Sequence, residues 1–310
     1  MSLTLTVDTA RWQAHVAAVA AAVGPGLIPV IKGNGYGVGR ASLATYCADL
    51  GRGLVAVGTV HETVEATAAG LPVLVLTPTL DDPGRLPDST VLTVGDPVHV
   101  AHLERCGWNR PVVVKLASSM RRYGFDDAPQ LSIPVAAYGL HLPLAGTDDD
   151  RLAEIDRWLA RLDPVVPVHL SHLSPDAFRG LADRHPQRRF SLRLGTSLWH
   201  GDKSAFHLTA TVLGVRPVRA GDRAGYRQGA VATDGHLVLV GAGTAHGVVP
   251  LDGGLSPLHY ARKRLALVEA PHMHTSMALV PDGDPVPGVG EQVDVQRPLT
   301  QVLPDAVIWR

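Results

Sequence analysis

The sequence lacks the features that mark secreted, membrane-bound and nucleic-acid-binding proteins. Two cysteines, Cys47 and Cys106, are too few for a disulfide framework and are typical of buried small residues in a cytoplasmic protein. The first residues carry no positively charged leader, and no run of about 18 apolar residues occurs, so we expect neither a signal peptide nor a membrane span. The net charge of −1 indicates no basic face for nucleic acid.

Short apolar runs are abundant in the first two thirds of the chain. Continuous apolar runs are typical of parallel strands that are buried on both faces. Most neighbouring runs are separated by a segment with helical spacing of apolar residues, most clearly Asp149–Leu162, whereas residues 79–89 show none. The alternation predicts a (β/α)8 barrel rather than a doubly wound sheet. The eight runs are Leu27–Lys32, Leu54–Thr59, Pro72–Pro78, Thr90–Gly95, Pro111–Ala117, Ile133–Leu142, Pro167–His172 and Phe190–Thr196.

The pattern changes near Ala205. Strand-like segments separated by Gly, Asp and Pro turns follow, without a convincing helix. We therefore expect the barrel to span residues 8–204 and a mostly β domain to span residues 205–310, which the N-terminal strand at residues 3–7 would join. The expected strands are His207–Leu213, His236–Ala242, Arg264–Val268 and Gln292–Val295.

Basic side chains gather where the predicted strands end, and active sites of such barrels lie at that rim. Lys32 ends the first run and precedes the Gly-rich turn Gly33–Gly39. Burial there would lower the pKa of its amine and free it for Schiff-base chemistry, although an exposed surface lysine is the alternative. The other rim residues indicate an anionic ligand, or else ordinary strand-end histidines and a buried ion pair. They are Arg122, His141, His172 and Arg193.

Two segments of the rim are candidates for binding phosphate. Barrels of this kind often bind phosphate with the loops after strands seven and eight. Those loops contain Ser174, at a predicted helix start, and Gly195-Thr196. Free N–H groups at a helix start favour phosphate, but helix capping alone would also explain Ser174.

The segment from Pro29 to Gly39, P-V-I-K-G-N-G-Y-G-V-G, resembles the cofactor-lysine motif of the alanine racemase family. The resemblance implies that Lys32 carries pyridoxal 5′-phosphate (PLP) covalently and that Tyr36 hydrogen-bonds its phosphate. A second segment, Lys115–Gly124, is similar to the family's K-x-D-T-G-M-x-R-x-G. It implies that Arg122 faces the substrate and that Lys115 is the lysine that is sometimes carbamylated.

The resemblance extends along the rest of the rim. It implies that His141 packs near the pyridine ring and that Arg193 faces the pyridine nitrogen. Gly195 and Thr196 would then contact the phosphate. His172 stands where the family has Asn, and Ser174 would replace a phosphate-binding Ser after a shift of one residue.

The β domain departs from the family at its catalytic tyrosine. The family's G-Y-A-D-G reads Gly243-Thr244-Ala245-His246-Gly247, so Thr244 stands in place of the tyrosine. A threonine hydroxyl is a far weaker acid than a phenol of pKa about 10, which makes it a poor replacement. His246 or His274 is a candidate second base, although packing histidines are the alternative. His272 and His274 would share a strand face and resemble a metal pair, but no third ligand is evident and no metal is expected.

These observations predict a PLP-dependent amino-acid racemase-like enzyme with an altered second base. The resemblance implies a homodimer, because the second base comes from the partner, and a small amino-acid substrate. Three alternatives remain open. One is a PLP-dependent decarboxylase or lyase on the same scaffold, another is a PLP-binding protein without turnover, and the third is a sugar- or phosphate-binding barrel that leaves Lys32 unmodified.

Overall fold

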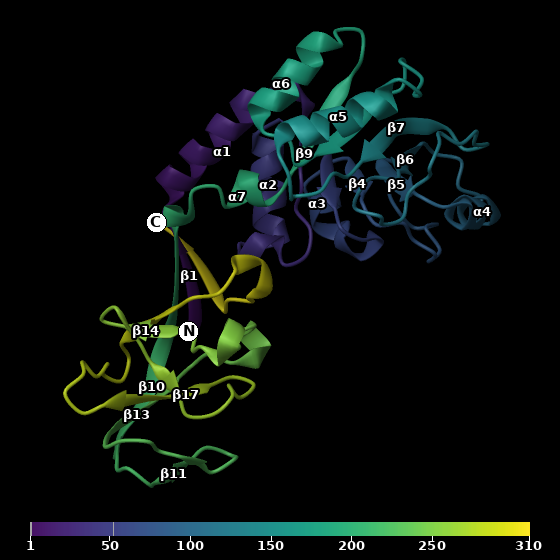
Figure 1. Cartoon of the computed structure of the whole chain (residues 1–310). Coiled ribbons are helices and arrows are strands. Elements are labelled where there is room, and N and C mark those ends of the chain that lie inside the picture. The colour runs from purple at the N-terminus through teal and green to yellow at the C-terminus, as the bar shows by residue number, and fades with distance from the viewer. Residues whose placement is uncertain (1, 52) are drawn as a thin grey trace. The chain divides into compact units, whose positions relative to one another are not determined.

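The computed structural model describes residues 2–51 and 53–310, and the chain divides into two compact units. One unit, the barrel unit, comprises Ala14–Gly201. The other, the β unit, combines the residues up to Gln13 with Asp202–Arg310. The two units are drawn together in Figure 1 and are described separately below.

The barrel unit is built on a parallel sheet of eight strands, which confirms all eight predicted strands and the predicted fold class. The strand order is β2-β9-β8-β7-β6-β5-β4-β3, and a parallel bridge between Val30 and Ala56 joins the two ends of the sheet. The strands are β2 (Leu27–Pro29), β3 (Val55–Val57), β4 (Val73–Val75), β5 (Thr90–Val94), β6 (Val112–Leu116), β7 (Val135–Leu140), β8 (Val168–Ser171) and β9 (Phe190–Leu194).

Helices follow most strands of the barrel. The helix predicted at Asp149–Leu162 is present at Asp148–Leu159, and residues 79–89 contain no helix, as expected. Two helices were not predicted, α1 and α7. The helix α1 is rich in alanine, which favours a helix by propensity without an apolar stripe that would reveal it. The helices are α1 (Thr9–Val23), α2 (Arg40–Asp49), α3 (Val64–Ala68), α4 (Pro97–Arg105), α5 (Asp148–Leu159), α6 (Pro175–Arg184) and α7 (Thr196–Trp199).

The interior of the barrel has an apolar core, and polar side chains follow at the carboxyl ends of the strands. The core is a buried cluster of Ile28, Val30, Ala56, Leu74, Val113 and Ala137. Side chains that share a face recur every second residue in a strand, so the next inward positions lie at the carboxyl ends. Lys32 follows Val30 by two residues, and Lys115 follows Val113 by two. The strand period therefore sets both lysines above the core.

The β unit is a nine-stranded, mostly antiparallel sheet. Its path is β15-β14-β18-β10-β13-β17-β16, and β1 (Leu3–Val7) pairs with β10 and β19. Three expected strands are present as β10 (Phe206–Val218), β13 (Gly235–Val240) and β18 (Gln292–Val295), while Arg264–Val268 is divided between β15 (Lys263–Arg264) and β16 (Ala266–Leu267). Strands not predicted are β14 (Leu258–Tyr260), β17 (Ser276–Pro281), β19 (Ala306–Trp309) and the hairpin of β11 (Arg223–Ala224) and β12 (Gly229–Ala230). Among the described residues, no helix has the length and apolar character needed to cross a membrane.

Candidate active site

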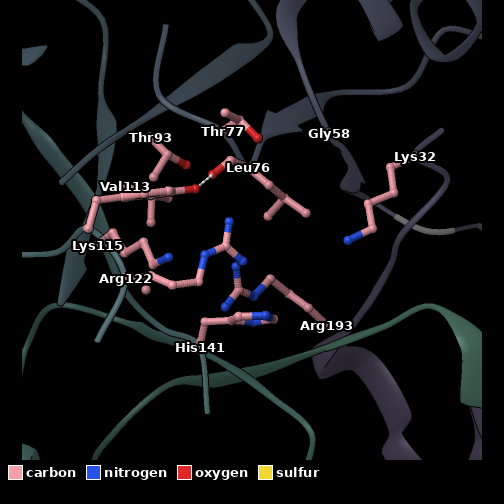
Figure 2. A pocket seen from close by; sticks show the side chains of 12 residues that line it. Lys32, Gly58, Leu76, Thr77, Thr93, Val113, Lys115, Arg122, His141 and Arg193 are labelled. Carbon is pink, nitrogen blue, oxygen red and sulfur yellow. Dashed lines mark hydrogen bonds between the residues drawn. The ribbon is translucent and has the colours of Figure 1, made fainter. Parts of the chain in front are cut away.

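A pocket opens at the carboxyl ends of the barrel strands, within the barrel unit alone. Four predicted residues, Lys32, Arg122, His141 and Arg193, line it together with Lys115. Figure 2 shows Lys32 reaching in from one side, with Lys115 and Arg122 on the other. The remaining lining residues are Gly58, Leu76, Thr77, Thr93, Val113, Tyr123 and Gly139.

Lys32 lies at the open edge of this pocket. Its side chain is exposed to solvent, yet partial burial together with the charges of Arg122 and Arg193 lowers the pKa of its amine. Glu62 opposes this shift, and its carboxylate is held by the N–H of Gly58 at 2.8 Å. A lysine with a lowered pKa is more often neutral and so more nucleophilic.

Lys115 is buried on β6, with 7% of its surface exposed. Its ammonium nitrogen lies 3.8 Å from the centre of the Tyr123 ring. Burial, Arg122 and Arg193 together lower the pKa of Lys115 to about 8. The side chain therefore remains mostly charged at neutral pH.

Arg193 and His141 lie beside each other at the ends of β9 and β7. The Arg193 guanidinium donates to the carbonyls of Leu140 at 3.1 Å and Leu170 at 3.4 Å, and burial lowers its pKa to about 10. Nδ1 of His141 lies 2.8 Å from Oγ of Ser171, a contact that fixes the ring. Burial and the charge of Arg193 lower the pKa of His141 to about 3, so its imidazole is neutral at pH 7.

Tyr36 points from the Gly-rich loop toward the start of α7. Its backbone adopts a left-handed conformation, with φ of 56°, and its side chain is buried. Gly195, the residue before α7, has no room for a side chain, because a Cβ there would overlap the Tyr36 hydroxyl. Burial raises the pKa of Tyr36, so the phenol stays protonated and available as a donor.

His172 joins this group, whereas Ser174 is engaged elsewhere. The His172 ring lies 4.7 Å from that of His141, and its Nδ1 lies 2.6 Å from the carbonyl of Leu142. Ser174 caps α6 by accepting from the N–H of Ala177 at 3.1 Å, while its own N–H faces the Asp148 carboxylate at 3.4 Å. A carboxylate at that helix start repels phosphate, so this geometry favours capping at Ser174 over phosphate binding.

The remaining candidates lie in the β unit. Thr244 and His274 are exposed, whereas His246 is buried with 7% of its surface exposed. Nδ1 of His246 accepts from the N–H of Gly243 at 3.1 Å, and its Nε2 lies 3.3 Å from the Asp305 carboxylate. The prediction that His272 and His274 share a strand face is wrong, because both lie in the irregular segment before β17.

Three residues of the site were not predicted. The Tyr123 ring lies near both Lys115 and Arg122, Ser171 contacts His141, and the charge of Glu62 acts on Lys32. Ser171 could have been predicted from the alternation of side chains along a strand, because this alternation identifies the residues at each strand end that face the barrel interior. The sequence carries no comparable signal for Tyr123 or Glu62, which come from loops.

Comparison with known proteins agrees with this geometry. Residues 7–143 match the family model described as the alanine racemase N-terminal domain. This part of the chain is similar to the N-terminal domain of alanine racemases. The matched stretch includes Lys32, Lys115, Arg122 and His141, and it ends before Arg193 and Gly195. No curated protein sequence matches the chain.

Solved alanine racemases share the fold over the whole chain. The enzyme of Bartonella henselae, crystallised with covalently bound pyridoxal phosphate, is 18% identical, with a TM-score of 0.78 and 100% of both chains covered. The enzyme of E. faecalis is 20% identical, with a TM-score of 0.72 and coverage of 100% of this chain and 98% of that one. The enzyme of D-cycloserine-producing Streptomyces lavendulae is 18% identical, with a TM-score of 0.70 and coverage of 100% and 97%. At such identities the likeness establishes the alanine racemase fold.

The contact between Gly195 and Tyr36 gives a first prediction. In Gly195→Ala the new methyl group displaces the Tyr36 hydroxyl, so the protein should retain PLP at least about tenfold less tightly, the loss of one hydrogen bond to a charged group. Gly180→Ala is the control, because a Cβ at Gly180 in α6 meets nothing within 4 Å. Fluorescence titration with PLP measures both variants, and equal affinity for PLP in Gly195→Ala and the wild type would rule out this phosphate site.

Proposed function

We propose that the chain is a PLP-dependent amino-acid racemase-like enzyme with an altered second base. The observation that carries the proposal is the barrel-mouth pocket, where the Lys32 amine faces Arg122 and Arg193 and the pKa of Lys32 is lowered. The family match over residues 7–143 supports the same reading. The substrate is an amino acid.

The residues at the barrel mouth fit PLP. The Tyr36 hydroxyl, with Gly195 and Thr196 at the start of α7, would hold the phosphate, because the absence of a side chain at Gly195 lets the hydroxyl lie beside the backbone there. Arg193 would face the pyridine nitrogen, with His141 and His172 nearby. When bound, PLP supplies an electron sink for the negative charge that develops at the substrate Cα.

The chain's own residues then have separate tasks. Nζ of Lys32 would hold the cofactor and would take or return the Cα proton of the substrate on one face. Arg122 binds the substrate carboxylate. Arg193 stays protonated near neutral pH, since its pKa is about 10. It would therefore donate to the pyridine nitrogen and would keep that nitrogen unprotonated.

The opposite face of the substrate needs a second base from the β unit. Thr244 takes the place of the family's tyrosine, and a hydroxyl of that kind does not transfer protons readily near neutral pH. His246 has both ring nitrogens engaged within the β unit, whereas His274 is exposed. His274 is therefore the stronger of the two candidates. We propose that the base reaches the barrel of a partner subunit in a homodimer.

The role of Lys32 as the residue that binds PLP is tested by chemical trapping. The chain has four lysines, Lys32, Lys115, Lys203 and Lys263, so the labelled peptide identifies which lysine binds the cofactor. Borohydride reduction of the PLP-treated protein should fix the mass of the cofactor on the Lys32 peptide, as found by mass spectrometry. A label on another lysine, or no label, would show that the proposal is wrong.

The second base is tested by exchange of the Cα proton in deuterated water. A two-base racemase exchanges with inversion, and a one-base enzyme exchanges mainly with retention. His274→Ala should lower inversion by about 10²- to 10⁴-fold, the usual loss for a general base, while His207→Ala, an exposed histidine paired with Asp294, should not. If His246→Ala and His274→Ala both racemise normally, neither histidine is the base.

Two further outcomes of this experiment are informative. Thr244→Tyr restores the phenol and should raise alanine racemisation if only the base has changed. Exchange with retention alone in the wild type would instead favour the decarboxylase or lyase alternative. The engagement of His246 by Asp305 is the observation that favours one-base chemistry.

The homodimer is tested by light scattering at micromolar concentration. A mass near twice the 32.8 kDa of one chain is expected, because the second base must come from the partner. A strictly monomeric protein that still racemises would contradict the assignment of the base to a partner subunit.

A further inference from the structure

The barrel-mouth pocket carries more positive charge than a monocarboxylic amino acid would neutralise. Lys32, Lys115, Arg122 and Arg193 line it, and none of the described residues that line it is an aspartate or glutamate. Glu62 lies outside the lining and acts on Lys32, but not on Lys115 or Arg193. The side of the pocket farthest from Lys32 therefore has unbalanced positive charge.

Lys115 contributes most to this imbalance. It is 7% exposed, and its ammonium group rests on the face of Tyr123 rather than on a carboxylate. The charges that act on it, those of Arg122 and Arg193, both repel it. A buried charge without a carboxylate partner is unfavourable, so an anion from outside the chain would be bound strongly there.

The position of Lys115 separates it from the proposed phosphate site. In the barrel order, β6 is four strands away from β2 in either direction, so Lys115 lies across the barrel from Lys32. Tyr36 and Gly195 belong to the side formed by β2 and β9. The cofactor phosphate would be held there and would leave Lys115 uncompensated. Arg122 and Lys115, by contrast, lie on the same aromatic ring, at 5.4 and 3.8 Å from the Tyr123 centroid.

We infer that the substrate is an amino acid with a second carboxylate in its side chain, of the aspartate or glutamate class. Arg122 binds the α-carboxylate, and Lys115 binds the side-chain carboxylate. The inference rests on the proposed function for its catalytic meaning. Carbamylation of Lys115 is the competing state, because it would place a negative charge there and suit a small neutral amino acid such as alanine.

The first test compares acidic amino acids with their neutral isosteres. Cα–H exchange in deuterated water is followed by NMR for aspartate and glutamate, for asparagine and glutamine, and for alanine. Lys115→Met, which keeps the length of the side chain, should lower kcat/KM for the acidic pair by about 10- to 100-fold, the loss of a charge-assisted hydrogen bond. Alanine should be affected much less. Lys203→Met, on an exposed lysine of the β unit, is the matched control.

A binding measurement separates this inference from the proposed function. Calorimetry on the PLP-loaded protein should show that succinate binds more tightly than its monoamide succinamate, and Lys115→Met should abolish the difference. If no amino acid exchanges its Cα proton but succinate is still preferred, the proposed function fails, whereas the assignment of Lys115 as a site for a second carboxylate stands. Equal binding of succinate and succinamate overturns the inference, whatever the exchange shows. A carbamate signal that depends on Lys115 in ¹³C-bicarbonate also overturns it.

Discussion

The convergence of four positive side chains on one barrel mouth is the constraint on which the site depends. Like charges in a low-dielectric pocket repel, and they are tolerated only when partners or a bound anion offset them. Backbone carbonyls of Leu140 and Leu170 partly offset Arg193, and the ring of Tyr123 partly offsets Lys115. Burial, together with the positive charge of this pocket, lowers the pKa of both lysines, and the charge favours anionic ligands.

The alternation of side chains along the barrel strands determines where these positive charges lie. Apolar inward residues such as Val30 and Val113 fill the core, and the next inward residues, Lys32 and Lys115, project above it. The same geometry sets Ser171 against His141 and keeps the imidazole neutral and oriented. Thr244, by contrast, is exposed in the β unit and begins the short 3-10 helix Thr244–His246.

The sequence predicts the barrel and its rim well, because continuous apolar runs and strand-end basic residues are local signals. Lys32, Arg122, His141 and Arg193 were each identified from such signals or from motifs, and one pocket contains them all. Features set by tertiary packing were not foreseen. The N–H of Ser174 contacts the Asp148 carboxylate, and His246 is buried against Asp305, so both contacts join segments far apart in the sequence. The contact of Lys115 with Tyr123 depends on how the loop after β6 folds back over the strand.

A crystal structure of the PLP-loaded protein tests the central claim most directly. The account predicts cofactor density continuous with Nζ of Lys32, phosphate on the Tyr36 hydroxyl beside Gly195, and the pyridine nitrogen facing Arg193. Phosphate bound at the start of α6 or on Lys115, with Lys32 unmodified, would contradict it.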